Sequence, residues 1–224
     1  MKLKMSRTAC VVLAACAVAG ALSACAPIVI GGAAVGTLMA ADRRTAGSQV
    51  EDEGIEMRAS SRIREQLGDR VHINVTSYNR QVLLTGEAAT AADAQKAEQI
   101  VLAVENVRSV VNDVGVMPNS SLSQRSNDTF ITGKVRASFV DAKDLYAAAF
   151  KVVTERDVVY LMGRVTQREA TRAAEIARGV NGVRKVVRVF ETITDDDVRR
   201  GFAQQPASSQ PAPVTQDPAA QPRN

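Results

Sequence analysis

The amino-acid sequence predicts an α+β fold of two small domains, each ordered helix–strand–strand–helix–strand. Three observations predict it: a repeat spaced by 77 residues, a pair of short apolar runs ending at a glycine in each copy, and an alanine-rich amphipathic segment after each pair. A unit of roughly 65 residues is marginal for one hydrophobic core. We therefore expect each copy to form a three-stranded mixed sheet packed by helices.

The paired apolar runs predict a β-hairpin in each copy. In the first copy they occupy residues 73–75 and 81–86, and in the second copy residues 150–152 and 158–163. Each pair is separated by a polar turn and ends at Gly86 or Gly163, the pattern typical of a hairpin. Asn79 suits its turn because its side chain tolerates a left-handed backbone.

The remaining elements follow from helical periodicity and from helix-ending residues. Residues 91–103 and 167–178 place apolar side chains three and four positions apart, which predicts one buried helix face in each copy. Asn106 and Gly182 suit the ends of these helices. A last strand is predicted at 107–116 and at 183–193, and an opening helix at 54–67 and at 128–139, with Asn127 or Asp128 as cap of the latter.

The N-terminus has the layout of a bacterial lipoprotein signal. A basic segment precedes an apolar run at 9–22, and Ser23 and Ala24 lead directly to Cys25. We expect residues 1–24 to be removed and Cys25 to be lipidated; an ordinary signal peptide with a chance cysteine is the alternative. Ala26 does not match the inner-membrane retention signal of enteric-type bacteria. The expected location is thus the outer membrane, lipid-anchored, at the periplasmic face.

The order of segments along the chain gives the expected domain boundaries. Residues 25–50 form a lipidated tether, 51–117 the first domain, 118–126 a polar linker, and 127–194 the second domain. Residues 195–224 are rich in Pro and Gln and are expected to be disordered.

The two domains differ in charge. Residues 51–117 hold seven basic and eleven acidic side chains, whereas 127–194 hold twelve basic and eight acidic. The second domain is therefore better suited to an anionic lipid surface. On its opening helix Phe130 lies about 100° from Ile131, and it could contact a membrane or pack against the tether or first domain. Arg164, Arg168 and Arg172 form either a basic stripe or a solvated helix face.

The glycine motif carries a family resemblance. Val82-Leu83-Leu84-Thr85-Gly86 with Val107-Arg108-Ser109-Val110, and Val159-Tyr160-Leu161-Met162-Gly163 with Gly182-Val183-Arg184-Lys185-Val186, resemble the BON domain. Together with the lipoprotein signal that ends at Cys25 (the lipobox), the two copies make the chain resemble dual-BON outer-membrane lipoproteins.

The resemblance implies a role in envelope integrity, at division sites, with an anionic phospholipid membrane as the ligand of the second domain. The outer-membrane protein assembly machinery or a cell-wall amidase activator is the implied protein partner. The implied phospholipid-binding residues lie on the helix that opens the second domain: Phe130, Ile131, Gly133, Lys134 and Ala137.

The sequence argues against an enzyme. His72 is the single histidine, and no nucleophile motif, metal-ligand spacing or phosphate-binding loop accompanies it. We therefore expect no cofactor and no metal. A mature net charge near +1 and the lack of tryptophan give no support to nucleic-acid binding. Two hypotheses remain: a phospholipid-binding lipoprotein, or a protein-interaction or stress-protective module held at the membrane only by its acyl anchor.

Overall fold

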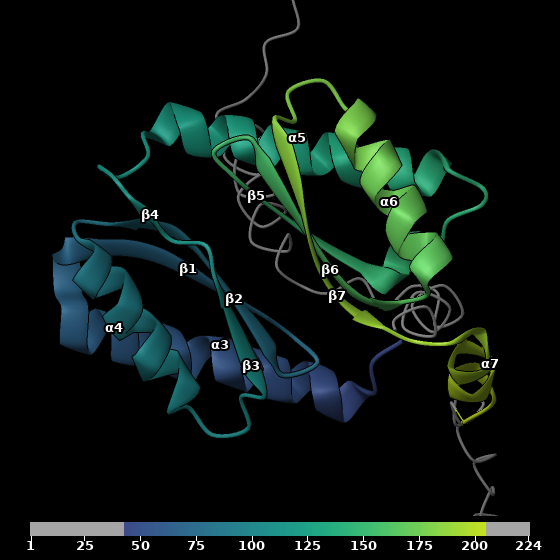
Figure 1. The fold of residues 1–224 in the computed structure, drawn as a ribbon, viewed down its shortest axis with the longest axis horizontal. Helices are drawn as coiled ribbons and strands as arrows, with labels where there is room; N and C mark the ends of the chain where they lie inside the picture. The colour runs from purple at the N-terminus through teal and green to yellow at the C-terminus, as the bar shows by residue number, and fades with distance from the viewer. Residues whose placement is uncertain (1–42, 205–224) are drawn as a thin grey trace, which may run out of the picture. The chain divides into compact units, whose positions relative to one another are not determined.

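Each copy of the repeat folds as a helix, an antiparallel hairpin, a second helix and a last strand that runs parallel to the second strand of the hairpin (Figure 1). The computed structural model describes residues 43–204, all within one compact unit. The predicted signal peptide, Cys25, most of the tether and the tail beyond residue 204 lie outside the described residues. The predicted α+β fold with mixed sheets is confirmed.

The first domain contains two helices and one mixed sheet. Its elements are α3 (Ala46–Leu67), a short 3-10 turn (Gly68–Arg70), β1 (Val71–Tyr78), β2 (Gln81–Ala88), α4 (Ala91–Leu102), β3 (Ser109–Asn112) and β4 (Gly115–Val116). Both β3 and β4 pair in parallel with β2, with Val82 opposite Val110 and Glu87 opposite Gly115. The strand predicted at 107–116 is therefore interrupted between β3 and β4.

The second domain repeats this order with an unbroken last strand. Its elements are α5 (Leu122–Asp141), a 3-10 turn (Ala147–Ala149), β5 (Phe150–Glu155), β6 (Val158–Val165), α6 (Gln167–Gly179) and β7 (Lys185–Thr192). The sheet order is β5-β6-β7, with β5 antiparallel and β7 parallel to β6. A further helix, α7 (Asp195–Gln204), follows.

Two helices start earlier than predicted, and one further helix was not predicted. The helix α3 begins within the predicted tether, capped by Thr45. The helix α5 begins at Leu122, because Ser121 and Gln124 form a capping box, so the proposed cap at Asn127 or Asp128 is wrong and residues 122–126 are not linker. The helix α7 occupies the first residues of the tail predicted to be disordered.

The glycines of the repeated motif are required by close backbone approach. A Cβ atom at Gly86, where φ is +107°, would overlap the carbonyl oxygen of His72 on the paired strand. A Cβ atom at Gly163 would lie 2.5 Å from the carbonyl oxygen of Ala149. The motif thus marks a place where only glycine lets the hairpin strands close.

A buried aspartate of the opening helix holds the hairpin turn in each domain. Asn79 and Arg80 have positive φ, and their backbone N–H groups donate to Asp52 at 2.7 Å. In the second domain Asp128 accepts the backbone N–H groups of the two turn residues at 156 and 157, each at 2.9 Å. The same helix position therefore satisfies the same two donors in both copies.

Three hydrophobic clusters stabilise the fold. One lies between sheet and helices in each domain, and both include the inward face of the opening helix. The third lies on the sheet faces turned away from the helices and joins the two domains. Its buried members come from β1, β2, β6 and β7: Tyr78, Leu83, Tyr160, Met162 and Val189. Strands β2 and β6 are therefore buried on both faces.

Candidate membrane-binding face of the second domain

The inner face of α5 belongs to the core. Ile131, Val135 and Phe139 are buried and pack against the sheet and α6. Ile131 was predicted as a phospholipid contact, and this prediction is wrong because its side chain has no exposed surface. Ile131 is the first apolar residue of α5 that packs in the core of the second domain. Of the predicted contacts, the structure leaves Phe130, Gly133, Lys134 and Ala137 on the outside.

The outer face of α5 carries exposed apolar residues along its length. Leu122, Phe130 and Val140 are 79%, 66% and 74% exposed. With 3.6 residues per turn they lie on one side of the helix together with Gly133 and Ala137, both also exposed. We call these five residues the α5 stripe. Sequence reasoning missed Leu122 and Val140 because it placed the first in a linker and ended the helix at residue 139.

Lys134 lies at the edge of the α5 stripe. Its Nζ atom is 4.8 Å from the centre of the Phe130 ring and donates a hydrogen bond to the carbonyl oxygen of Asn181, just after α6. The ring and the hydrocarbon stem of the lysine thus form one apolar surface with a cationic end. This arrangement suits a boundary between acyl chains and anionic headgroups.

A shallow groove lies beside the α5 stripe, between α5 and α6. It has a volume of about 570 Å³, and Lys134, Ala137, Asp141 and Arg172 are among its lining residues. Glu175 also lines it, so the groove holds two basic and two acidic side chains. The groove offers space for a small polar group next to the exposed apolar residues.

The three arginines proposed as a basic stripe do not share a helix face. Arg164 lies in β6 and pairs with Glu191, because α6 begins only at Gln167. Arg172 donates to the carboxylate of Asp144 at 2.8 Å, and Arg168 donates to the carbonyl of the same residue. The stripe hypothesis is therefore wrong, since one member is on another element and the other two turn to Asp144.

Phe130 does not pack on the first domain. Two-thirds of its surface is exposed, and its ring contact is with Lys134 of its own helix. The alternative that Phe130 covers the first domain is therefore not supported. The tether, the other proposed contact, lies outside the described residues.

The part of the chain that the structure describes holds no group of three His, Cys, Asp or Glu side chains placed to bind a metal ion. His72 is half-buried in β1. Between residues 43 and 204 no helix has the length and apolar content needed to cross a bilayer.

The model of the BON domain matches residues 52–118 and residues 127–193. The chain belongs to the BON-domain family. The first BON domain thus contains most of α3 through β4, and the second contains most of α5 through β7.

Two curated relatives extend the similarity to most of the chain. The outer membrane lipoprotein DolP of Haemophilus influenzae is 37% identical over 173 residues, covering 76% of this chain and 89% of that protein. The 21 kDa hemolysin of Actinobacillus pleuropneumoniae is 34% identical over 154 residues, covering 68% and 79%. The predicted resemblance to dual-BON, DolP-like proteins is confirmed.

A solved structure of CdsD, a structural protein of the type III secretion system of Chlamydia trachomatis, also matches. It covers 70% of this chain and 99% of its own, with 14% identity and a TM-score of 0.26. A similarity this low carries no argument about function.

Proposed function

We propose that this chain is a non-catalytic, lipid-anchored protein of the outer membrane, facing the periplasm, whose second BON domain binds anionic phospholipids. The α5 stripe carries the proposal, because three large apolar side chains on one side of one helix are exposed to water. The lipobox at Cys25 supports the anchor, and the similarity to the outer membrane lipoprotein DolP supports the outer membrane. Envelope integrity and a place at division sites rest on the family resemblance.

The energetics suit reversible binding beside a permanent anchor. Full burial of a side chain such as Phe130 contributes about 1.5–3 kcal/mol, and a basic residue near an anionic surface contributes about 1 kcal/mol. The stripe and Lys134 together therefore give modest affinity from solution. Lipidation at Cys25 would raise the effective concentration of the domain at the bilayer, so modest affinity is sufficient.

The test measures binding of the mature chain with Cys25→Ser to vesicles by co-sedimentation. Vesicles of phosphatidylcholine alone are compared with vesicles that also contain phosphatidylglycerol or cardiolipin. We expect binding only to the anionic vesicles. Phe130→Glu should weaken it at least about tenfold, since the change removes apolar area and adds a repelling charge.

The matched control is Met57→Glu in the first BON domain, because Met57 is 69% exposed on α3. It adds the same charge at similar exposure and should bind like the parent chain. Circular dichroism checks that both variants fold. If the parent chain does not bind anionic vesicles, lipid recognition is excluded and the acyl anchor remains the membrane contact of a protein-interaction module.

A further inference from the structure

The two BON domains contact each other at two places, called seams here, that the internal repeat relates. The first seam contains Asn79, Arg108 and Glu191, and the second contains Gly115, Arg156 and Arg184. In the second domain β6 pairs Arg164 with Glu191 of β7. At the corresponding place of the first domain β2 pairs Glu87 with Gly115 of β4. Glu191 and Gly115 therefore hold the same position in the two sheets, 76 residues apart. One seam has a carboxylate there and the other has no side chain.

Glu191 is held by the first BON domain. Its carboxylate accepts hydrogen bonds from the Asn79 amide at 2.7 Å, from Arg108 at 3.0 Å and from Arg164 of its own sheet at 3.2 Å. Burial alone would raise the pKa of Glu191, but Asn79 and Arg108 outweigh it and lower the pKa below its ordinary value. This seam is thus a carboxylate site filled by the chain itself.

The second seam keeps the cation and lacks the carboxylate. Arg184 corresponds to Arg108, because Arg108 immediately precedes β3 and Arg184 immediately precedes β7. Arg184 donates to the carbonyl oxygen of Arg156 at 3.0 Å. Within residues 43–204 neither Arg184 nor its neighbour Lys185 forms an ion pair. The carboxylate of Glu87 is already bound by Arg156 at 2.6 Å.

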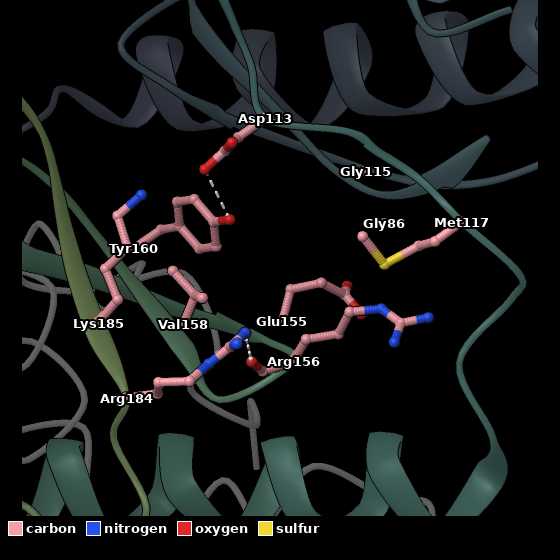
Figure 2. Close-up of a pocket in the computed structure, with 10 residues that line it drawn as sticks. All are labelled: Gly86, Asp113, Gly115, Met117, Glu155, Arg156, Val158, Tyr160, Arg184 and Lys185. Atoms are coloured by element: carbon pink, nitrogen blue, oxygen red, sulfur yellow. Dashed lines mark hydrogen bonds between the residues drawn. The ribbon is translucent and has the colours of Figure 1, made fainter. Parts of the chain in front are cut away.

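A pocket of about 550 Å³ occupies the place of the missing carboxylate (Figure 2). Gly115 lines it together with Arg184 and Lys185. Figure 2 shows Asp113 engaged by the hydroxyl of Tyr160, which donates to it at 2.9 Å. The other walls are largely apolar and include Val158, the Tyr160 ring and Met117, and the charged side chains of Glu155 and Arg156 also line the pocket.

We propose that this pocket binds an acidic side chain presented by an extended segment of a protein partner. Arg184 would hold the carboxylate as Arg108 holds Glu191, with Lys185 adding positive charge. A peptide fits better than a lipid headgroup, because the equivalent carboxylate belongs to a β-strand and the apolar walls accommodate a neighbouring side chain. The site is separate from the α5 stripe, so it does not depend on the proposed lipid binding.

The first experiment uses a probe copied from the filled seam. Acetyl-Phe-Glu-Thr-amide reproduces residues 190–192, and the same peptide with Gln in place of Glu is the matched control. Amide shifts of the mature chain with Cys25→Ser, measured by NMR, should change around the pocket with the Glu peptide alone. Arg184→Gln should weaken binding at least about tenfold, the cost of one charge-assisted hydrogen bond. Arg178→Gln, at an exposed position of α6, should leave it unchanged.

The second experiment builds the missing carboxylate into the chain. Gly115 does not have positive φ, and an added Cβ would meet the end of the Met117 side chain at 2.7 Å, which can move aside. Gly115→Glu should abolish peptide binding and raise the melting temperature above that of Gly115→Gln. This increase in melting temperature should vanish when Arg184→Gln is added, because the new carboxylate then has no arginine at position 184 to pair with.

Three results would overturn the proposal. Equal binding of the Glu and Gln peptides would show that charge is not recognised. Equal melting temperatures of Gly115→Glu and Gly115→Gln would show that Arg184 does not reach a carboxylate there. Pocket shifts caused by glycerol 3-phosphate and not by the Glu peptide would make the site one for phosphate. Vesicle binding by Arg184→Gln should equal that of the parent chain, so failure of the lipid proposal is observed separately.

Discussion

The helices α3 and α5 are the same element of the repeat with different outer faces. Their inner residues correspond at a spacing of 76, as Asp52 with Asp128 and Ile55 with Ile131, and all four are buried. On the outside, Gly54 of α3 corresponds to the exposed Phe130 of α5. The inner positions therefore maintain the fold, while the outer positions are free to acquire a binding surface.

The cations of the two outer faces also have different neighbours. Arg58 of α3 corresponds to Lys134 of α5. Arg58 forms an ion pair with Glu51 at 2.7 Å, and its guanidinium lies over Gly54. Lys134 lies over the Phe130 ring, and the residue that corresponds to Glu51 is the uncharged Asn127. On α3 the exposed apolar side chains Val50 and Met57 lie beside a cation paired with a carboxylate, whereas on α5 the stripe lies beside a cation that contacts an aromatic ring.

The largest expected effect concerns what the two helices share. Asp52→Ala should lower the free energy of unfolding by about 3–5 kcal/mol, because besides the acceptor of the turn N–H groups it removes the buried carboxylate that pairs with Arg44 at 2.8 Å. Asp128→Ala removes the acceptor of two turn N–H groups and should cost about 2–3 kcal/mol. Urea unfolding followed by circular dichroism measures both.

Hydrogen exchange of the turn amides at residues 79–80 and 156–157 locates the loss. Each variant should expose the turn of its own domain first. A loss below about 1 kcal/mol in both variants would mean that the aspartates are not the common support of the hairpins.

An exchange of outer residues tests what the helices do not share. Phe130→Ala should reduce partitioning to phosphatidylglycerol vesicles about tenfold or more. Gly54→Phe in that background should not restore it, since Arg58 remains paired with Glu51 in an acidic domain. Adding Glu51→Asn, which copies Asn127, should recover part of the binding. Full recovery by Gly54→Phe alone would break the comparison, because any exposed aromatic residue would then suffice.

Local patterns predicted the elements well where burial is periodic. Both hairpins, the motif glycines and the alanine-rich helices lie close to their predicted residues. The starts of α3 and α5 were missed because their first turns are polar and carry little periodicity. Thr45 before α3, and the Ser121 and Gln124 capping box before α5, were the available signals.

The candidate site was predicted in part, for a geometric reason. Periodicity separates Phe130 from Ile131, yet the predicted contacts included both, and only burial excludes the second. Contacts between distant residues have no local signal. Arg43 forms a two-point ion pair with Glu169, 126 residues away, with both bonds at 2.7 Å. Asp52 and Asp128 could have been found, because an aspartate recurs at one position of the repeat.

The residue that precedes each hairpin turn gives the last and smallest contrast. The first BON domain places Tyr78 there and the second places Glu155. Burial, together with the charges of Glu87 and Asp128, raises the pKa of Glu155, while Asn74 and Arg156 oppose the shift. The folded protein therefore holds this proton more tightly than the unfolded chain. The resulting stability is fully present below the ordinary pKa of 4.5 and is lost as pH rises through the raised pKa.

Glu155→Gln mimics the protonated side chain and keeps an acceptor for the Asn74 amide, which donates to Glu155 at 2.9 Å. The variant should be more stable than the parent chain at neutral pH, by less than about 1 kcal/mol, and the two should converge below the ordinary pKa. Urea unfolding across this pH range measures the difference, with Glu105→Gln at an exposed position as control. A Glu155→Gln variant less stable at neutral pH would mean that Asn74 and Arg156 together stabilise the ionised form more than burial opposes it. The position before the turn would then be stabilised by a charged side chain in the second domain and by the buried ring of Tyr78 in the first.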